Sequence, residues 1–152
     1  MPDERTRNPL PPAWHVARLR VPLFEVDLGQ AVYHGNVLHL FELAREEFLR
    51  ELQYPYRRFM EEETHLAVVE LSCSYRRPLR YDDLIQVHTA VPQWRTRSLV
   101  FSQAIFREEG NGKSSLCTQA RLHMVCIRFS GRPTVLPPEF VERLKRHPLA
   151  SR

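Results

Sequence analysis

The chain of 152 residues contains no run of about 20 apolar residues, which is the length that a membrane-spanning helix needs. Its first residues, Met1–Pro12, are polar and rich in proline, and they lack the apolar core of a signal peptide. We therefore expect no membrane insertion and predict a cytoplasmic location.

Cysteine is scarce and has no regular spacing. The chain has three cysteines, Cys73, Cys117 and Cys126, so they cannot all pair in disulfides. Their spacing is not that of a zinc motif, and each lies in an apolar, strand-like segment. We interpret them as reduced core residues. His39 and His65 also lack ligand spacing, so we predict no metal site.

The sequence lacks an internal repeat and any sign of a second domain. We predict a flexible N-terminal tail over residues 1–12 and a single domain over residues 13–147, long enough for a substantial core.

The net charge of +4 is mildly basic. It fits nucleic-acid binding, an anionic small ligand such as a nucleotide-bearing cofactor, or simply a solvated surface. Because arginine is scattered along the chain, the charge alone favours the solvated surface.

The chain does contain a segment with clear helical periodicity. Its apolar residues recur at steps of three and four: Val37, Leu40, Phe41, Ala44, Phe48 and Leu52. This pattern predicts a helix with one buried face, which Tyr54-Pro55 should end. Gly35-Asn36 marks its start, and we expect the Asn36 side chain to cap it by accepting hydrogen bonds from free amides of the first turn.

A turn with an acid precedes this helix. Asp27 and Gly29 punctuate the turn, and Tyr33 and His34 follow just before the positive end of the helix. Free amides, a helix dipole and a carboxylate in one place suit chemistry on a carbonyl group. Aspartate is also a common turn former, so Asp27 taken alone fits a structural role as well.

Strand-like alternation precedes the turn and follows the helix. It covers Trp14–Phe24, His65–Tyr75, Asp83–Trp94, Ser98–Glu108 and Leu116–Arg128. In the second of these segments the pattern predicts one shared face for Ala67, Val69, Leu71, Cys73 and Tyr75. Hairpin turns are expected at residues 95–97 and 109–112, and a short helix at Glu139–Arg146. A strand, a long helix and four further strands predict an α+β fold with the helix covering one face of the sheet.

Four segments carry a family resemblance. They are Asp27-x-Gly29-x-x-Val32-Tyr33-His34-x-Asn36, Phe41-Glu42-x-Ala44-Arg45, Tyr75-x-x-Pro78-x-Arg80-x-Asp82-Asp83 and Arg97-Ser98-Leu99-Val100-Phe101-x-Gln103-x-Ile105. Together they resemble the hotdog-fold acyl-CoA thioesterases of the 4-hydroxybenzoyl-CoA thioesterase family, and within it the Tol-Pal-associated acyl-CoA thioesterase branch. The resemblance spans about residues 15–143.

The resemblance implies a particular architecture. A five-stranded antiparallel sheet would wrap around one long central helix, which is the hotdog fold. Subunits would join their sheets into a homodimer or a dimer of dimers (a homotetramer), with the active site at the subunit interface.

The resemblance also implies an activity, which is hydrolysis of acyl-CoA to a free acid and CoA, with no cofactor besides the CoA of the substrate. Asp27 matches the family's catalytic aspartate, acting as nucleophile or general base. The backbone amide of His34 would polarise the thioester carbonyl, and Tyr33 beside it is either a pocket wall or a catalytic group. Val26 and Gln30 stand where the branch usually has threonine and a second glycine, and the change at Gln30 is expected to affect the turn or the acyl pocket.

Substrate-binding residues are predicted in two groups. Glu42, on the second turn of the helix, either faces the site across the interface or forms a surface ion pair with Arg45 or Arg50. Basic or polar residues that would contact the CoA phosphates are Arg76, Arg77, Arg97 and Ser98.

Three alternatives stay open at this point. A non-catalytic acyl-CoA-binding hotdog module would share the same residues. A hotdog hydratase is disfavoured by the aspartate at the helix entry and by the missing His/Asp pairing. A nucleic-acid binder is disfavoured because basic and aromatic residues do not interleave.

Overall fold

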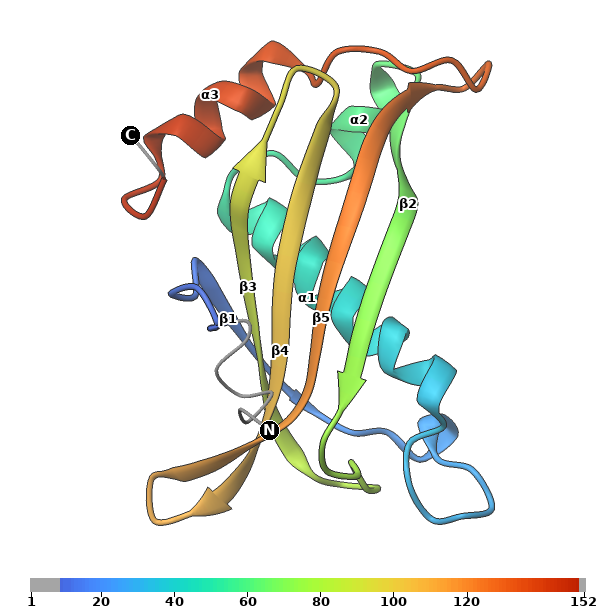
Figure 1. Cartoon of the computed structure of the whole chain (residues 1–152), viewed down its shortest axis with the longest axis vertical. Coiled ribbons are helices and arrows are strands. Elements are labelled where there is room, and N and C mark those ends of the chain that lie inside the picture. The colour runs from blue at the N-terminus through green and yellow to red at the C-terminus, as the bar shows by residue number, and fades with distance from the viewer. Residues whose placement is uncertain (1–8, 151–152) are drawn as a thin grey trace, which may run out of the picture.

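The computed structural model describes residues 9–150, which form one antiparallel sheet of five strands packed on a long helix (Figure 1). The strands lie in the order β1-β3-β4-β5-β2. Their bounds are β1 (His15–Arg20), β2 (Thr64–Tyr75), β3 (Leu84–Trp94), β4 (Ser98–Gly110) and β5 (Lys113–Arg128). The helices are η2 (Leu23–Glu25), η3 (His34–Asn36), α1 (Val37–Glu51), α2 (Arg57–Glu61) and α3 (Pro138–Arg146). Most of the predicted tail, residues 1–8, lies outside the described residues, so the domain boundaries stay predictions.

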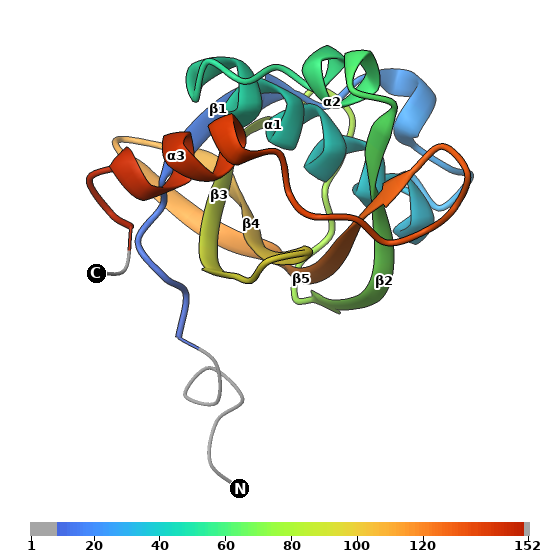
Figure 2. The same cartoon turned by 90° about the horizontal axis from the view of Figure 1, so that it is seen from above.

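Helix α1 supplies the centre of the core. The sheet curves around it, and Figure 2 shows the helices gathered on one side of the sheet. The buried side chains of α1 are those of Val37, Leu40, Phe41, Ala44, Phe48 and Leu49. Burying a large apolar side chain contributes about 1.5–3 kcal/mol, so Phe41 and Phe48, which are at most 1% exposed, anchor the helix. The predicted α+β class, with a five-stranded antiparallel sheet around one long helix, is confirmed.

The predicted alternation holds along most of the three central strands, although register shifts interrupt the β3–β4 pairing between Ala90 and Gln93 and the β4–β5 pairing between Ile105 and Phe106. The face turned toward α1 carries buried residues from each strand, namely Ile85, Val87, Val91, Leu99, Phe101, Ile105, Ala120, Leu122 and Cys126. Both predicted hairpin turns are present. In the second, Asn111 and Gly112 have φ values of 55° and 73°, a left-handed pair that matches the twist of the flanking strands.

Edge strand β2 departs from the predicted alternation. The register against β5 shifts between Val68 and Glu70, which inserts one additional residue, a β-bulge. Leu66 pairs with Cys126 on the helix side, whereas Ala67 pairs with Val125 on the other side. The predicted common face of Ala67 and the later residues is therefore wrong. A bulge changes which side of the sheet the following residues face, and period-two counting alone does not detect it.

On both sides of the bulge, and at the bulge itself, β2 carries apolar side chains that stay exposed. The large exposed apolar residues on this strand are Val68, Val69, Leu71 and Tyr75. We call these four residues of the edge strand the β2 row. Since β2 lies at the edge of the sheet, its outer backbone groups are also available for pairing.

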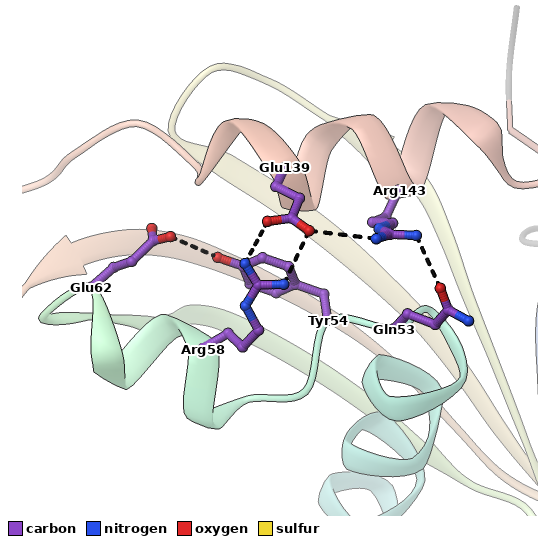
Figure 3. Close-up of polar contacts among 6 residues, drawn as sticks. All are labelled: Gln53, Tyr54, Arg58, Glu62, Glu139 and Arg143. Atoms are coloured by element: carbon purple, nitrogen blue, oxygen red, sulfur yellow. Dashed lines mark hydrogen bonds and ion pairs between the residues drawn. The ribbon is translucent and has the colours of Figure 1, made fainter.

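The C-terminal helix α3 closes one end of the core. It buries Phe140 and Leu144, both 0% exposed, and the ring of Phe140 packs against the buried ring of Tyr54 just after α1. A polar network surrounds this contact, as Figure 3 shows: Glu139 of α3 pairs with Arg58 of α2 and with Arg143. The remaining contacts in the network are Tyr54 donating to Glu62, Arg143 donating to Gln53, and the Arg58 guanidinium lying 4.5 Å from the Tyr54 ring centroid.

Candidate active site

The turn ahead of α1 holds Asp27 in a defined orientation. The backbone N–H of Gly29 donates to Oδ1 of Asp27 at 2.8 Å, and the N–H of Asp27 donates to the carbonyl of Ala31 at 3.0 Å. Val26 and Val32 form a bridge that closes the turn. Asp27 is therefore an exposed carboxylate on a hydrogen-bonded turn.

Gly29 and Gln30 shape this turn in different ways. A Cβ at Gly29 would lie 3.0 Å from Oδ1 of Asp27, so glycine allows the close approach of the carboxylate. Gln30 has a φ of 64°, in the left-handed region that favours glycine. The turn thus has a backbone conformation suited to glycine, although the side chain at position 30 is glutamine.

The helix begins differently from the prediction. A short 3-10 turn, η3, runs directly into α1, and the Asn36 side chain makes no capping hydrogen bond. Its Nδ2 instead donates to the carbonyl of Glu25 at 3.2 Å. The predicted cap is wrong because Asn36 has a helical backbone conformation and its amide is drawn to a carbonyl from the preceding segment. The first backbone N–H groups of η3, beginning with that of His34, still lie at the positive end of the helix dipole.

The structure brings Tyr33 and His34 together at this helix start. Their ring centroids lie 4.2 Å apart, and both side chains are exposed. A Cβ at Gly35 would lie 3.1 Å from Cε1 of Tyr33, so glycine lets the tyrosine ring pack closely on the backbone. The hydroxyl of Tyr75, at the end of β2, donates to the carbonyl of His34 at 2.6 Å.

Glu25 is a site residue that the sequence did not reveal. Only 3% of it is exposed, and its backbone carbonyl accepts from the N–H of Tyr33 and from Asn36. Its carboxylate lies 3.0 Å from Nδ1 of His39 on the first turn of α1. Glu25 thereby ties the Asp27 turn to the helix start. The one sequence feature that could have indicated a role for Glu25 was its position two residues before Asp27. Its hydrogen-bond partners could not be inferred, because they lie eight or more residues away along the chain.

Glu42 lines a mostly apolar cavity of about 160 Å³ between α1 and the sheet. The other lining residues are Arg45, Glu46, Leu49, Tyr56, Leu66, Phe101 and Met124. Arg45 donates to Oε1 of Gln103 at 3.0 Å, so it reaches into the core and does not form a surface pair with Glu42. Burial lowers the pKa of the Arg45 guanidinium, while the Glu42 and Glu46 carboxylates act in the opposite direction.

Within a single chain, the four residues predicted to contact CoA lie in two separate groups. Arg76 and Arg77 directly follow β2, at the end of the sheet near His34, whereas Arg97 and Ser98 lie at the β3–β4 turn at the opposite end (Figure 1). Arg76 borders a cleft of about 310 Å³ on the outer face of the sheet, and Ser98 borders a neighbouring cleft of about 330 Å³. Arg121 lines both clefts, and sequence analysis did not single it out.

Within residues 9–150, no three His, Cys, Asp or Glu side chains lie close enough together to hold a metal ion. In the same part of the chain, every helix is too short or too polar to cross a membrane.

Comparison with known proteins identifies the family. Residues 21–144 match the model of the Thioesterase-like superfamily. The acyl-CoA thioester hydrolase YbgC of Escherichia coli O6:H1 is 30% identical over 129 residues, which are 84% of this chain and 93% of the relative. The acyl-CoA thioesterase YbgC of Haemophilus influenzae is 29% identical over 130 residues, which are 85% of this chain and 92% of the relative.

Solved structures agree on the fold. A DHNA-CoA thioesterase from Staphylococcus aureus superposes with a TM-score of 0.80 at 24% identity, covering 86% of this chain and 88% of that one. A 4-hydroxybenzoyl-CoA thioesterase complexed with 4-hydroxybenzoyl-CoA gives 0.77 at 20% identity, covering 90% and 98%. The chain therefore belongs to the Thioesterase-like superfamily, has the hotdog fold, and is a hydrolase of the thioesterase class. The family recognition made from the sequence is confirmed.

Proposed function

We propose that this chain hydrolyses acyl-CoA thioesters to a free acid and coenzyme A. The observation that supports this most directly is the Asp27 carboxylate, held by the Gly29 N–H at 2.8 Å in the turn that leads into the helix start at His34. A fixed carboxylate ahead of helix amides combines a nucleophile or base with a place for developing negative charge. The YbgC relatives are thioester hydrolases by name and support the same reaction.

Two routes fit the proposed site. In the first, Asp27 attacks the thioester carbon, the C–S bond breaks, CoA leaves as a thiolate, and water then hydrolyses the mixed anhydride. In the second, Asp27 accepts a proton from a water molecule whose oxygen attacks the same carbon, and the C–S bond breaks to release acid and CoA. In both routes the carbonyl oxygen gains negative charge, to which we propose the His34 amide donates. Tyr33 would form a wall beside it, and the proposed reaction needs no cofactor.

We propose that the cavity beside Glu42 receives the acyl group. An apolar cavity of about 150 Å³ can hold a benzene molecule, so this cavity of about 160 Å³ suits one ring or a short chain. Glu42 lies eight residues beyond His34, which corresponds to about 12 Å along a helix. A short acyl group attached to a thioester at His34 does not reach that far, so we propose that the cavity serves Asp27 of a second protomer.

We propose that the two protomers join along their β2 edges, as a homodimer or a dimer of such dimers. The β2 row supplies exposed apolar area, and the edge supplies unpaired backbone groups. An antiparallel join of two β2 edges places the β3–β4 turn of one sheet at the same end as Arg76 of the other. The two groups of predicted CoA-contacting residues, separated in one chain, would then border one substrate. The location proposed for this assembly is the cytoplasm.

The test is a thiol-release assay on short, long and aromatic acyl-CoAs with the full chain and Asp27→Asn. General acid–base catalysis contributes about 10²–10⁴-fold, so we expect a rate loss of at least about 100-fold with CoA binding retained. Asp82→Asn is the matched control, because Asp82 is also an exposed turn aspartate, and its rate should stay unchanged. Binding of acyl-CoA without turnover of any thioester by the unmodified chain would instead indicate a non-catalytic acyl-CoA-binding module.

A further inference from the structure

The hydroxyl of Tyr75 contacts the first peptide of the helix start. Tyr75 is the last residue of β2, and its Oη lies 2.6 Å from the carbonyl oxygen of His34, 41 residues away in sequence. This distance is at the short end of the range for an O–H···O hydrogen bond. The edge strand is thereby tied to the peptide that opens the helix.

We propose that Tyr75 is a positioning residue for the oxyanion-binding amides at the helix start. The proposal rests on the proposed thioesterase function. A trans peptide unit is planar, with its C=O and N–H pointing in opposite directions. By fixing the oxygen of His34, Tyr75 fixes the plane of the His34–Gly35 peptide and the direction of the Gly35 N–H. The His34 N–H, one peptide earlier, is restrained through the same residue.

The hydrogen bond also changes the strength of the amide donor. A hydrogen bond to the carbonyl of a peptide polarises that peptide, and chains of such bonds reinforce one another. With Tyr75 donating to the His34 oxygen, the Gly35 N–H becomes a better donor to a developing oxyanion. The structure therefore provides two neighbouring amides, those of His34 and Gly35, for the thioester oxygen.

The helix start needs support from outside because η3 has no side-chain cap. On the side of the Asp27 turn, Glu25 supplies it, since its carbonyl accepts from the N–H of Tyr33 at 3.0 Å and from Asn36. On the side of the sheet, Tyr75 supplies it. The His34 peptide is thus restrained from two directions by residues that do not themselves lie in the helix.

Tyr75 stays protonated, and so remains a hydrogen-bond donor, well above neutral pH. Desolvation, with a smaller effect of Cys73, raises the pKa of Tyr75 to about 12. Its hydroxyl therefore keeps the proton that it donates to His34.

The decisive variant is Tyr75→Phe in the full chain, assayed for thioester hydrolysis. Loss of one neutral hydrogen bond should lower kcat about 5- to 10-fold and leave KM within about twofold. Binding of a thioether analogue, which lacks the carbonyl oxygen, should not change, because the oxyanion amides have nothing to bind in it. Tyr81→Phe, at an exposed tyrosine near β3, is the control and should behave like the unmodified chain.

A spectroscopic measurement separates positioning from a merely structural role. In the Asp27→Asn background, which should keep the substrate intact, the carbonyl stretch of a bound ¹³C-labelled thioester should move to higher frequency when Tyr75→Phe is added. Unchanged kcat and an unchanged stretch would overturn the inference. If the unmodified chain hydrolyses no thioester, the proposed function fails, whatever Tyr75 does. If Asp27→Asn hydrolyses normally, only the proposed role of Asp27 fails.

A second variant covers the case in which Tyr75→Phe does not fold. Difluorotyrosine at position 75 keeps the hydroxyl but ionises at lower pH than tyrosine. The inference then requires kcat to fall at a pH where the unmodified chain shows no change, since the ionised oxygen no longer donates to His34. A kcat profile identical to that of the unmodified chain would contradict it.

Discussion

The buried carboxylate of Glu25 lies 3.0 Å from Nδ1 of His39, and this pair joins the segment before the Asp27 turn to the first turn of α1. Because Glu25 is nearly inaccessible to water while the side chain of His39 is 61% exposed, removing His39 costs a hydrogen bond to the carboxylate that water replaces only in part. We expect His39→Ala to lower the free energy of unfolding by about 1–2 kcal/mol, measured by urea denaturation at neutral pH. His65→Ala is the control, and an equal loss there would contradict a specific role for the pair.

Gly29→Ala should impair hydrolysis with little effect on stability. The added Cβ would meet Oδ1 of Asp27 at 3.0 Å and push the carboxylate out of its orientation. A misplaced catalytic group loses about 10-fold or more in rate, so we expect kcat to fall by at least that factor. Thermal unfolding should change by no more than a few degrees, because Gly29 is exposed and its φ is not in the left-handed region. A kcat that stays unchanged would argue against this orientation of Asp27 in catalysis.

Gln30→Gly should stabilise the chain. Gln30 has a φ of 64°, which costs a residue with a side chain about 1–2 kcal/mol, while glycine loses about 0.5–1 kcal/mol of conformational freedom. The difference predicts a gain of roughly 0.5–1 kcal/mol in the free energy of unfolding, read from chemical denaturation. Gln30→Ala should give no such gain, because alanine keeps the Cβ that conflicts with a positive φ. A lower stability for the glycine variant would contradict the strain at this position.

His147 makes stability depend on pH in a defined direction. Its ring stacks on Trp14 at 4.3 Å between centroids, and burial lowers the pKa of His147 from its usual value near 6.5. Below that value the unfolded chain binds the proton more readily than the folded chain, so stability should fall as pH decreases from 6.5 toward the lowered pKa. His147→Gln should flatten this decline in thermal unfolding measured between pH 7.5 and 5. His88, whose pKa burial also lowers, should account for the slope that remains.

The attachment of α3 should depend on its apolar contacts more than on its ion pairs. Arg58 and Glu139 are partly exposed to solvent, and ion pairs of that kind contribute little, so Glu139→Gln should leave the melting temperature nearly unchanged. Phe140 is fully buried against Tyr54 and Phe59, and Phe140→Ala should cost about 3–5 kcal/mol. Differential scanning calorimetry of both variants provides the comparison. A larger loss for Glu139→Gln would show that the polar network dominates.

Much of the fold follows from local patterns. The stripe of α1 from Val37 to Phe48, the alternation along most of β3 to β5 and the two hairpin turns depend on residues close together in sequence, and they were predicted correctly. Leu52, also assigned to the stripe, lies just past the end of α1 and is half-buried. Asp27, Tyr33 and His34 were selected because they precede a helix with a strong apolar face and match the motif of the family resemblance, and the structure places them in adjoining turns. Their catalytic roles stay predictions.

Apart from the bulge in β2, the errors and omissions involve polar partners distant in sequence. The side chain of Asn36 satisfies the carbonyl of Glu25 and leaves the helix uncapped. Arg45 was considered only as a surface partner of Glu42, yet it reaches Gln103, 58 residues later. Composition and periodicity report which residues are apolar and how they repeat, but they do not report which polar groups meet in space.

The extra residue in β2 has an effect beyond its own strand. Before the irregularity, Leu66 and Val68 pair with helix-side residues of β5, and after it Leu71 and Tyr75 do so. In an uninterrupted strand every second residue counted from Leu66 would face α1, and Tyr75, an odd number of positions away, would project from the back of the sheet. Deleting a single residue at this point would reverse that phase and remove the phenol from reach of the His34 carbonyl. The one extra residue thus determines whether the edge strand of the sheet contacts the start of the helix.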